Sequence, residues 1–161
     1  MATDPTRLRV VFDTNVVVAA LLSRNPQSPL TELVRRWRRG EFEFLYCADL
    51  LSEYREKLTA KNVQADKARR FLDDLVSKGT SIVLTPADIL PRVPNDPDDD
   101  MVIACAIAGE ATYLVTYDPH LHALGEEYQG VCILDGLHFL YALRGDVPSE
   151  ITPPPATISP R

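Results

Sequence analysis

The amino-acid sequence predicts an α/β protein, a three-layer sandwich in which helices cover both faces of a central, mostly parallel sheet of about five strands. Segments with strand character alternate with segments of helical spacing along almost the whole chain. The segment 10–12 is apolar at every position, which is typical of a strand buried on both faces of a parallel sheet. The chain has 161 residues, 45% of them apolar, which is enough for one domain with a sizeable core.

The first elements follow from this pattern. A strand at 8–12 ends abruptly in Asp-Thr-Asn, and the next segment, 16–22, is apolar all round and predicts a short buried helix. Pro29 behind Ser28 is a favourable helix start, because proline at the first helical position loses no hydrogen bond. This second helix is expected to end near Gly40.

The middle of the chain predicts two further strands, at 42–47 and 81–85, with helices at 49–58 and 64–78 between them. Apolar residues recur in both helices at helical spacing, so each helix has one apolar face. The proline-rich segment 86–97 is expected to be an irregular loop, because proline removes a hydrogen bond from helices and sheets alike.

The last part of the domain predicts a helix of small residues, two strands and a final helix, at 101–108, 112–118, 130–134 and 136–143. The domain is therefore expected to span residues 1–145. Residues 146–161 are rich in proline and poor in apolar residues, which predicts a mobile tail.

Charge and composition narrow the functional class. The net charge of −6 argues against a protein that grips nucleic acid over its whole surface, but it allows a local basic patch beside an acidic, metal-loaded pocket. The three cysteines, Cys47, Cys105 and Cys132, are widely spaced in apolar segments, which favours buried thiols and indicates a reducing, cytoplasmic setting. Neither a signal peptide nor a membrane-spanning run is visible, so we expect a soluble protein without a membrane partner.

Acidic residues stand at the ends of two predicted strands, where ligands bind in parallel α/β sheets. Asp13 follows the first strand and Asp118 the fourth. If Glu53 and Asp100 join them, the carboxylates repel one another unless a cation is present. An all-oxygen ligand set favours Mg²⁺ or Mn²⁺ over zinc, and such an ion can activate water for attack on a phosphodiester.

Each acid also has a purely structural explanation. A strand-end aspartate such as Asp13 or Asp118 often only caps a turn. Glu53 alone is a solvated helix residue, and the acids of the run 98–100 are favoured at a helix start by capping and by the helix dipole. The metal hypothesis gains weight from the number of acids that one strand order would bring to the same edge.

Three blocks of the sequence resemble the PIN-domain nucleases found as toxins of bacterial and archaeal toxin–antitoxin pairs. They are 10–16 (Val-Val-Phe-Asp-Thr-Asn-Val), 52–58, and 96–106 leading into 113–118, of which the last is the most specific. The resemblance covers about residues 8–143. It implies a PIN-like fold and a cytoplasmic endoribonuclease that uses Mg²⁺ or Mn²⁺ and leaves a 5′-phosphate. It also implies an antitoxin partner whose peptide fills the groove.

Carried over residue by residue, the metal-binding and catalytic acids of the family fall on Asp13, Glu53, Asp100 and Asp118. Asp99 remains an alternative to Asp100, because some relatives carry this acid one position earlier. The resemblance also implies supporting roles, in orienting the acids or the attacking water, for Thr14, Asn15, Thr116, Asp99 and Asp96. Tyr117 stands where the usual pattern has a small residue, which bears on the width of the substrate entrance. One metal ion or two, and the RNA target, stay open.

Other features have two interpretations each. The arginines of the second helix contact RNA or a partner, or form a solvated face: Arg35, Arg36, Arg38 and Arg39. Trp37 belongs to the core or to a homodimer contact. His120 and His122 follow Pro119 and are expected to be surface residues of a loop.

Two other functions compete with the ribonuclease. Asp13 could act as the nucleophile of a phosphatase of the haloacid dehalogenase type, but those enzymes carry Asp-x-Asp at this strand end, and Asn15 replaces the second acid here. A non-catalytic module that binds RNA or a partner is the third hypothesis.

Overall fold

The computed structural model describes residues 7–94 and 96–145. The predicted tail, 146–161, lies outside the described residues. The sheet is 6-stranded with the order β3-β2-β1-β4-β6-β5. Its strands are β1 Arg9–Phe12, β2 Glu43–Tyr46, β3 Thr80–Ser81, β4 Tyr113–Val115, β5 Glu127–Tyr128 and β6 Val131–Leu134. All pairs are parallel except β5 with β6, so the predicted α/β class with a mostly parallel sheet is confirmed.

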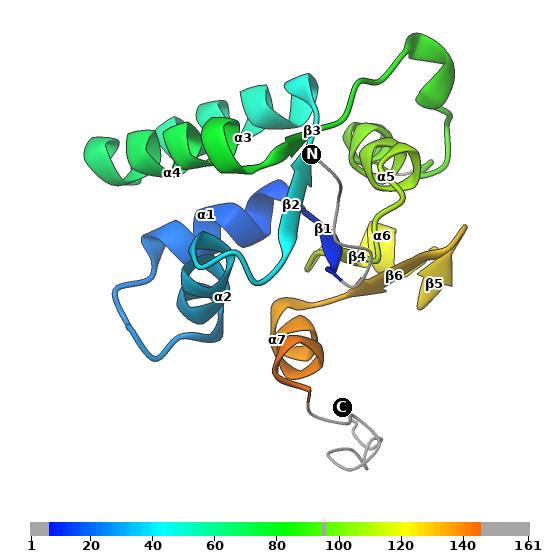
Figure 1. Ribbon diagram of the computed structural model, residues 1–161. Coiled ribbons are helices and arrows are strands. Elements are labelled where there is room, and N and C mark those ends of the chain that lie inside the picture. The colour runs from blue at the N-terminus through cyan, green and yellow to red at the C-terminus, as the bar shows by residue number, and fades with distance from the viewer. Residues whose placement is uncertain (1–6, 95, 146–161) are drawn as a thin grey trace.

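Helices surround the sheet in the layers that the sequence predicts (Figure 1). They are α1 Thr14–Leu22, α2 Pro29–Arg38, α3 Ala48–Ala60, α4 Ala65–Lys78, α5 Asp98–Ala108, α6 Pro119–His122 and α7 Gly136–Arg144. Helix α5 packs against β1, β2 and β4, whereas α7 contacts α2 and β4 from the other side. In the part of the chain that the structure describes, no helix has the length and apolar character needed to cross a membrane.

The core is built around β1, the first strand in the sequence and a central strand in the sheet. Val11 pairs with Leu45 of β2 and with Leu114 of β4, and all three are fully buried. On the α7 side, the ring of Phe12 stacks on Phe42 and Phe44 and meets Phe139 edge-on. Because β1 is held from both sides, the position of its carboxyl end is fixed.

Trp37 belongs to the same aromatic core. Its ring packs against Phe44 and Phe71 and only 3% of the residue is exposed. Of the two interpretations of this tryptophan, the core is the one that the structure supports.

Two strands differ from the prediction. The third strand is only Thr80–Ser81, and β5 was not expected. The β5–β6 hairpin turns through Gln129 and Gly130, which both have positive φ. This conformation suits a two-residue hairpin turn, but the usual Asn-Gly or Asp-Gly signal is absent from the sequence.

The thiols agree with the prediction of free cysteines: Cys47 and Cys105 are buried and Cys132 is partly buried. The proline-rich segment 86–97 is largely irregular as expected, apart from a short 3₁₀ turn at Pro86–Asp88.

Candidate metal centre

The candidate site lies at the carboxyl ends of β1 and β4, which are neighbours in the sheet. Asp13 directly follows β1, and its backbone N–H donates to the Val115 carbonyl at 2.9 Å. This bond continues the ladder beyond the end of β1, so the residues that follow the two strands lie at the same edge. The edge is where parallel α/β sheets bind ligands.

Asp13 is almost fully buried, with 5% of the residue exposed. Its Oδ1 accepts from the Thr14 N–H at 2.8 Å, and its Oδ2 accepts from Thr116 Oγ1 at 2.7 Å. Burial raises the pKa of Asp13, and the negative charges of Asp118 and Glu53 raise it further against these hydrogen bonds. Asp13 is therefore both the N-cap of α1 and a carboxylate held at the site.

Thr116 connects the acids that follow β1 and β4. Its hydroxyl donates to Asp13, and the same oxygen accepts from the Asp118 N–H at 2.9 Å. Thr116 is completely buried, so both bonds are protected from water. The predicted supporting role of this residue matches its position.

Glu53 approaches the site from α3. Thr14 Oγ1 donates to Glu53 Oε1, and the neighbouring Tyr54 hydroxyl donates to the Phe12 carbonyl, which holds α3 at the end of β1. Glu53 also lines a hollow of about 580 Å³ with Asp49, Ser52, Glu56, Pro97, Asp98 and Met101. Thr14 thus positions Glu53, whereas Asn15 is exposed.

Asp100 does not join the other acids. Its Oδ1 accepts from the backbone N–H groups of Arg92 and Val93, both at 2.8 Å, and so fastens the proline-rich loop to the start of α5. Successive helical residues point about 100° apart, so Asp99 and Asp100 leave the helix in different directions. The structure therefore directs Asp100, the first choice from the sequence, to a structural contact, and it brings the alternative, Asp99, to Asp118.

Asp99 is buried, and its Oδ2 has no hydrogen-bond partner among the described residues. Burial raises the pKa of Asp99 to about 9, and its hydrogen bond with Asp118 and the charges of Asp13, Asp118 and Asp96 act in the same direction. A buried oxygen without a partner is costly, which is the first indication that a cation belongs here.

Four side chains around Asp99 form a cluster: Asp96, Asp99, Asp118 and His120 each offer one ligand atom, all within 4.8 Å of one another. His120 Nδ1 lies 3.4 Å from Asp118 Oδ1 and 3.8 Å from Asp96 Oδ2. Burial tends to raise the pKa of Asp118, but hydrogen bonds from Asp99 and from the His120 N–H, with the nearby imidazole, hold it below its ordinary value. The raised pKa of Asp99 favours its protonated form beside Asp118, and a divalent cation at the cluster would displace this proton.

His120 is the site residue that sequence reasoning missed. It lies on α6, a single helical turn that was expected to be a loop. Asp118 is the N-cap of this turn and accepts from the His120 N–H at 2.8 Å, while Pro119 occupies the first helical position. An aspartate followed by a proline is a helix start signal, so the sequence itself indicates a helical turn after Asp118. His122 lies outside the cluster, with Nε2 2.8 Å from the Thr116 carbonyl oxygen.

The arginines of α2 do not approach the acids of the site. Arg36 pairs with Glu32 and Glu41, each at 2.8 Å, and Arg38 pairs with Asp74 at 2.9 Å. Arg39 lies 3.9 Å from Glu41, and Arg35 donates weakly to the Pro26 carbonyl at 3.4 Å. These contacts within the chain agree with a solvated helix face, and a contact with RNA or a partner stays a prediction.

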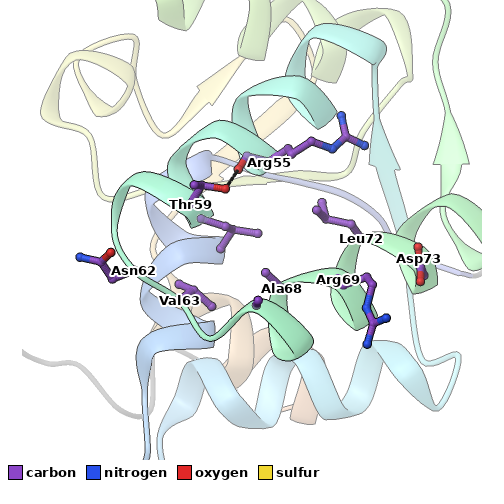
Figure 2. A pocket seen from close by; sticks show the side chains of 10 residues that line it. Arg55, Thr59, Asn62, Val63, Ala68, Arg69, Leu72 and Asp73 are labelled. Carbon is purple, nitrogen blue, oxygen red and sulfur yellow. Dashed lines mark hydrogen bonds between the residues drawn. The ribbon is translucent and has the colours of Figure 1, made fainter.

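A second hollow, of about 480 Å³, lies between α3 and α4 and holds none of the predicted acids. Figure 2 shows Leu72, Ala68 and Val63 along it, with the guanidinium groups of Arg55 and Arg69 at its edge. It is separate from the carboxyl edge of the sheet.

Comparison with known proteins agrees with this geometry. The family model of the PIN domain matches residues 9–120, a range that contains Asp13, Glu53 and the four-residue cluster. A search of curated proteins found no match.

Two solved structures share the fold. One is VapBC2 from Rickettsia felis, bound to a DNA fragment from their promoter, with a TM-score of 0.54 and 15% identity over 80% of this chain and 98% of that chain. The other is PAE2754 from Pyrobaculum aerophilum, with a TM-score of 0.56 and 19% identity over 86% of this chain and 91% of that chain. At this identity the likeness concerns the fold, and the family model covers most of the domain. The chain therefore belongs to the PIN domain family.

Proposed function

We propose that this protein is a metal-dependent endoribonuclease that hydrolyses RNA phosphodiester bonds with an activated water. The observation that carries the proposal is the buried Asp99, whose Oδ2 has no partner among the described residues and whose carboxylate belongs to a cluster of ligand atoms. Burial of a carboxylate oxygen is costly unless the oxygen is paired, and a bound cation would provide the partner that lowers this cost.

The residues fit Mg²⁺ or Mn²⁺. Asp96, Asp99 and Asp118 offer carboxylate oxygens, and His120 adds an imidazole nitrogen that Mn²⁺ accepts more readily than Mg²⁺. When bound, the ion would supply a nucleophilic water and charge stabilisation at the phosphorus. We assign Asp99 rather than Asp100 to the ligand set, because Asp100 is engaged by the backbone of Arg92 and Val93.

The remaining residues of the site orient the ligands. Thr116 holds Asp13 Oδ2 and the Asp118 backbone, so the two acids keep a fixed separation. Thr14 holds Glu53, which faces the site from α3 and can orient a water molecule. These roles follow from hydrogen bonds that are already formed without substrate.

RNA as substrate and the toxin role rest on the family. One solved structure with a similar fold is of VapBC2 with promoter DNA, which supports a protein antitoxin as a partner of this chain as well. The acidic edge and the net charge of −6 would repel RNA phosphates, so a cation is also needed to admit the substrate. A homodimer, a cytoplasmic location and the 5′-phosphate product belong to the same proposal.

The experiment uses the full chain, stripped of metal and then supplied with Mg²⁺, Mn²⁺ or Ca²⁺, and 3′-labelled single-stranded RNA and DNA of equal sequence. We expect RNA cleavage with Mg²⁺ and Mn²⁺, a 5′-phosphate on the downstream product, and no cleavage by Asp13→Asn. Mn²⁺ binding is measured separately by calorimetry. Cleavage at the same rate without a divalent ion, or by Asp13→Asn, would refute the mechanism, and binding of RNA without turnover by the parent would identify a binding module.

A phosphatase with Asp13 as nucleophile receives no support from the site. Both carboxylate oxygens of Asp13 accept hydrogen bonds, and the residue is buried. An attacking oxygen needs access to phosphorus that this arrangement does not provide. Detection of a phosphoaspartate at Asp13 by mass spectrometry would reverse this conclusion.

A further inference from the structure

Tyr117 is the residue between Thr116 and Asp118, and it differs from every other aromatic side chain in the described part of the chain. The phenylalanines and the tryptophan are buried in the core, and the other tyrosines are buried or half-buried. Tyr117 has 47% of its surface exposed. An exposed aromatic ring placed directly before a site acid requires a physical explanation, because burial would normally be favourable.

The position of the Tyr117 ring is built into the fold. It lies over Gly136, the first residue of α7, which follows β6 at the same carboxyl edge of the sheet as the acids. A Cβ at residue 136 would come within 2.7 Å of the Tyr117 hydroxyl oxygen and 2.4 Å of Leu30 Cδ2. Both atoms are ends of flexible side chains, so a Cβ here would make them shift. The hydroxyl end of Tyr117 therefore rests against the start of α7, while the rest of the side chain is largely exposed.

Tyr117 directly precedes Asp118 in the chain, so the ring and this acid start from neighbouring backbone positions. Thr116 turns inward to Asp13, and its hydroxyl also holds the Asp118 backbone. The Cα atom of Tyr117 lies about 3.8 Å from the Cα atoms of Thr116 and Asp118, because consecutive Cα atoms are this far apart across a trans peptide. A nucleotide whose phosphate lies at the acid cluster has a base within reach of this ring.

We propose that Tyr117 is a stacking platform for the base of a nucleotide beside the cleaved phosphate. This inference rests on the proposed ribonuclease function. Bases of a single strand are free to stack on aromatic side chains, whereas bases of a duplex already stack on one another. Stacking is also suited to this site because the acidic edge offers no phosphate attraction of its own.

The first arm of the test measures cleavage kinetics on a single-stranded RNA that the parent cleaves. Tyr117→Ala is expected to raise KM about tenfold and to leave kcat within about threefold, since stacking is lost and the metal ligands remain. Tyr117→Phe keeps the ring and is expected to match the parent. Leu137→Ala, a change at an exposed apolar residue on the same helix as Gly136, is the matched control and should have no effect.

The second arm changes the RNA and leaves the protein as it is. An abasic nucleotide is moved along the substrate, and the parent should lose about tenfold in kcat/KM at one position beside the cleaved bond. Tyr117→Ala should show no additional loss at that position. The scan on the parent needs no variant, and a parent that loses nothing at any position beside the cleaved bond would refute the inference even if Tyr117→Ala folds poorly.

The third arm needs no turnover. RNA that carries 2-aminopurine at the position identified by the abasic scan is mixed with the Asp13→Asn variant in Mg²⁺. The fluorescence of 2-aminopurine should fall on binding, because the base stacks on the ring. With the double variant Asp13→Asn and Tyr117→Ala, the fluorescence should not fall. If the parent cleaves RNA and all three arms show no role for the ring, the inference is wrong and the ribonuclease stands. If Tyr117→Ala alters only sedimentation of the protein, the ring is a contact between proteins and the inference is equally refuted. If no RNA is cleaved or bound, the proposed function itself fails.

Discussion

Glu32 on α2 and Asp99 at the start of α5 are both acids with strongly shifted pKa values, but the shifts have opposite directions. Hydrogen bonds from Arg144 and Arg36 lower the pKa of Glu32 to about 2. Burial, together with neighbouring acids, raises the pKa of Asp99 to about 9. Glu32 has its cations within the chain, whereas Asp99 has only other acids and His120 around it. Glu32 thus has its charge balanced by arginines of this chain, whereas the balance at Asp99 depends on the ion that we propose.

The largest expected effect comes from Asp99→Asn, compared with Asp98→Asn. Loss of the buried carboxylate should lower RNA cleavage and Mn²⁺ affinity by about 100-fold or more, because this oxygen has no other partner. Asp98 is an exposed aspartate on the same turn, so the same substitution there should change both by less than about threefold. Cleavage assays and Mn²⁺ calorimetry on both variants measure this. Equal effects of the two changes would mean that only net charge matters.

A smaller effect is expected from Thr116→Val, which removes a hydroxyl and keeps the shape of the side chain. Asp13 Oδ2 and the Asp118 N–H each lose a partner, so kcat should fall about 10- to 100-fold, as for other groups that orient metal ligands. Thr116→Ser keeps the hydroxyl and should retain most activity. Unchanged cleavage by Thr116→Val would show that the two acids are positioned without it.

Asp100→Ala should affect stability and not the metal. Two backbone N–H groups, of Arg92 and Val93, would lose their acceptor, which costs about 1–3 kcal/mol of unfolding free energy. Urea unfolding measures this, and Asp100→Asn should recover part of the loss through its carbonyl oxygen. Mn²⁺ affinity of the folded variant should remain within about twofold of the parent. A large loss of Mn²⁺ affinity would return Asp100 to the ligand set.

The smallest effect is expected from Glu32→Gln. The carboxylate is partly exposed, so its ion pairs with Arg36 and Arg144 contribute about 0.5–1 kcal/mol at neutral pH after solvent screening. The folded pKa lies below the ordinary value of 4.5, so this contribution is present above pH 4.5 and is lost as the pH falls toward 2. Urea unfolding at pH 7 and pH 2.5 should show the difference between parent and variant shrinking. A difference that grows at low pH would contradict the assignment.

The sequence predicted the alternation of strands and helices, and with it the edge at which Asp13 and Asp118 meet, because both follow from local patterns. The choice between Asp99 and Asp100 could not be made in the same way. It depends on the rotation of α5 about its own axis. Asp100 accepts hydrogen bonds from the backbone of a loop, which hold this rotation, and the conformation of that loop leaves no periodic pattern in the sequence. His120 was missed because a single helical turn is too short for an apolar repeat, and β5 because its turn lacks the common residues.

The order of the sheet also determines when the site at the carboxyl ends of β1 and β4 can form during synthesis of the chain. Asp13 and Thr116 are 103 residues apart, and β1 has no β4 to pair with until the ribosome has made the intervening chain. At synthesis rates of about 5–20 residues per second, this interval lasts roughly 5–20 s. Throughout that time Asp13 is present but Asp118 is not. A growing chain therefore cannot assemble the site, and a protein partner translated nearby would have this interval in which to bind.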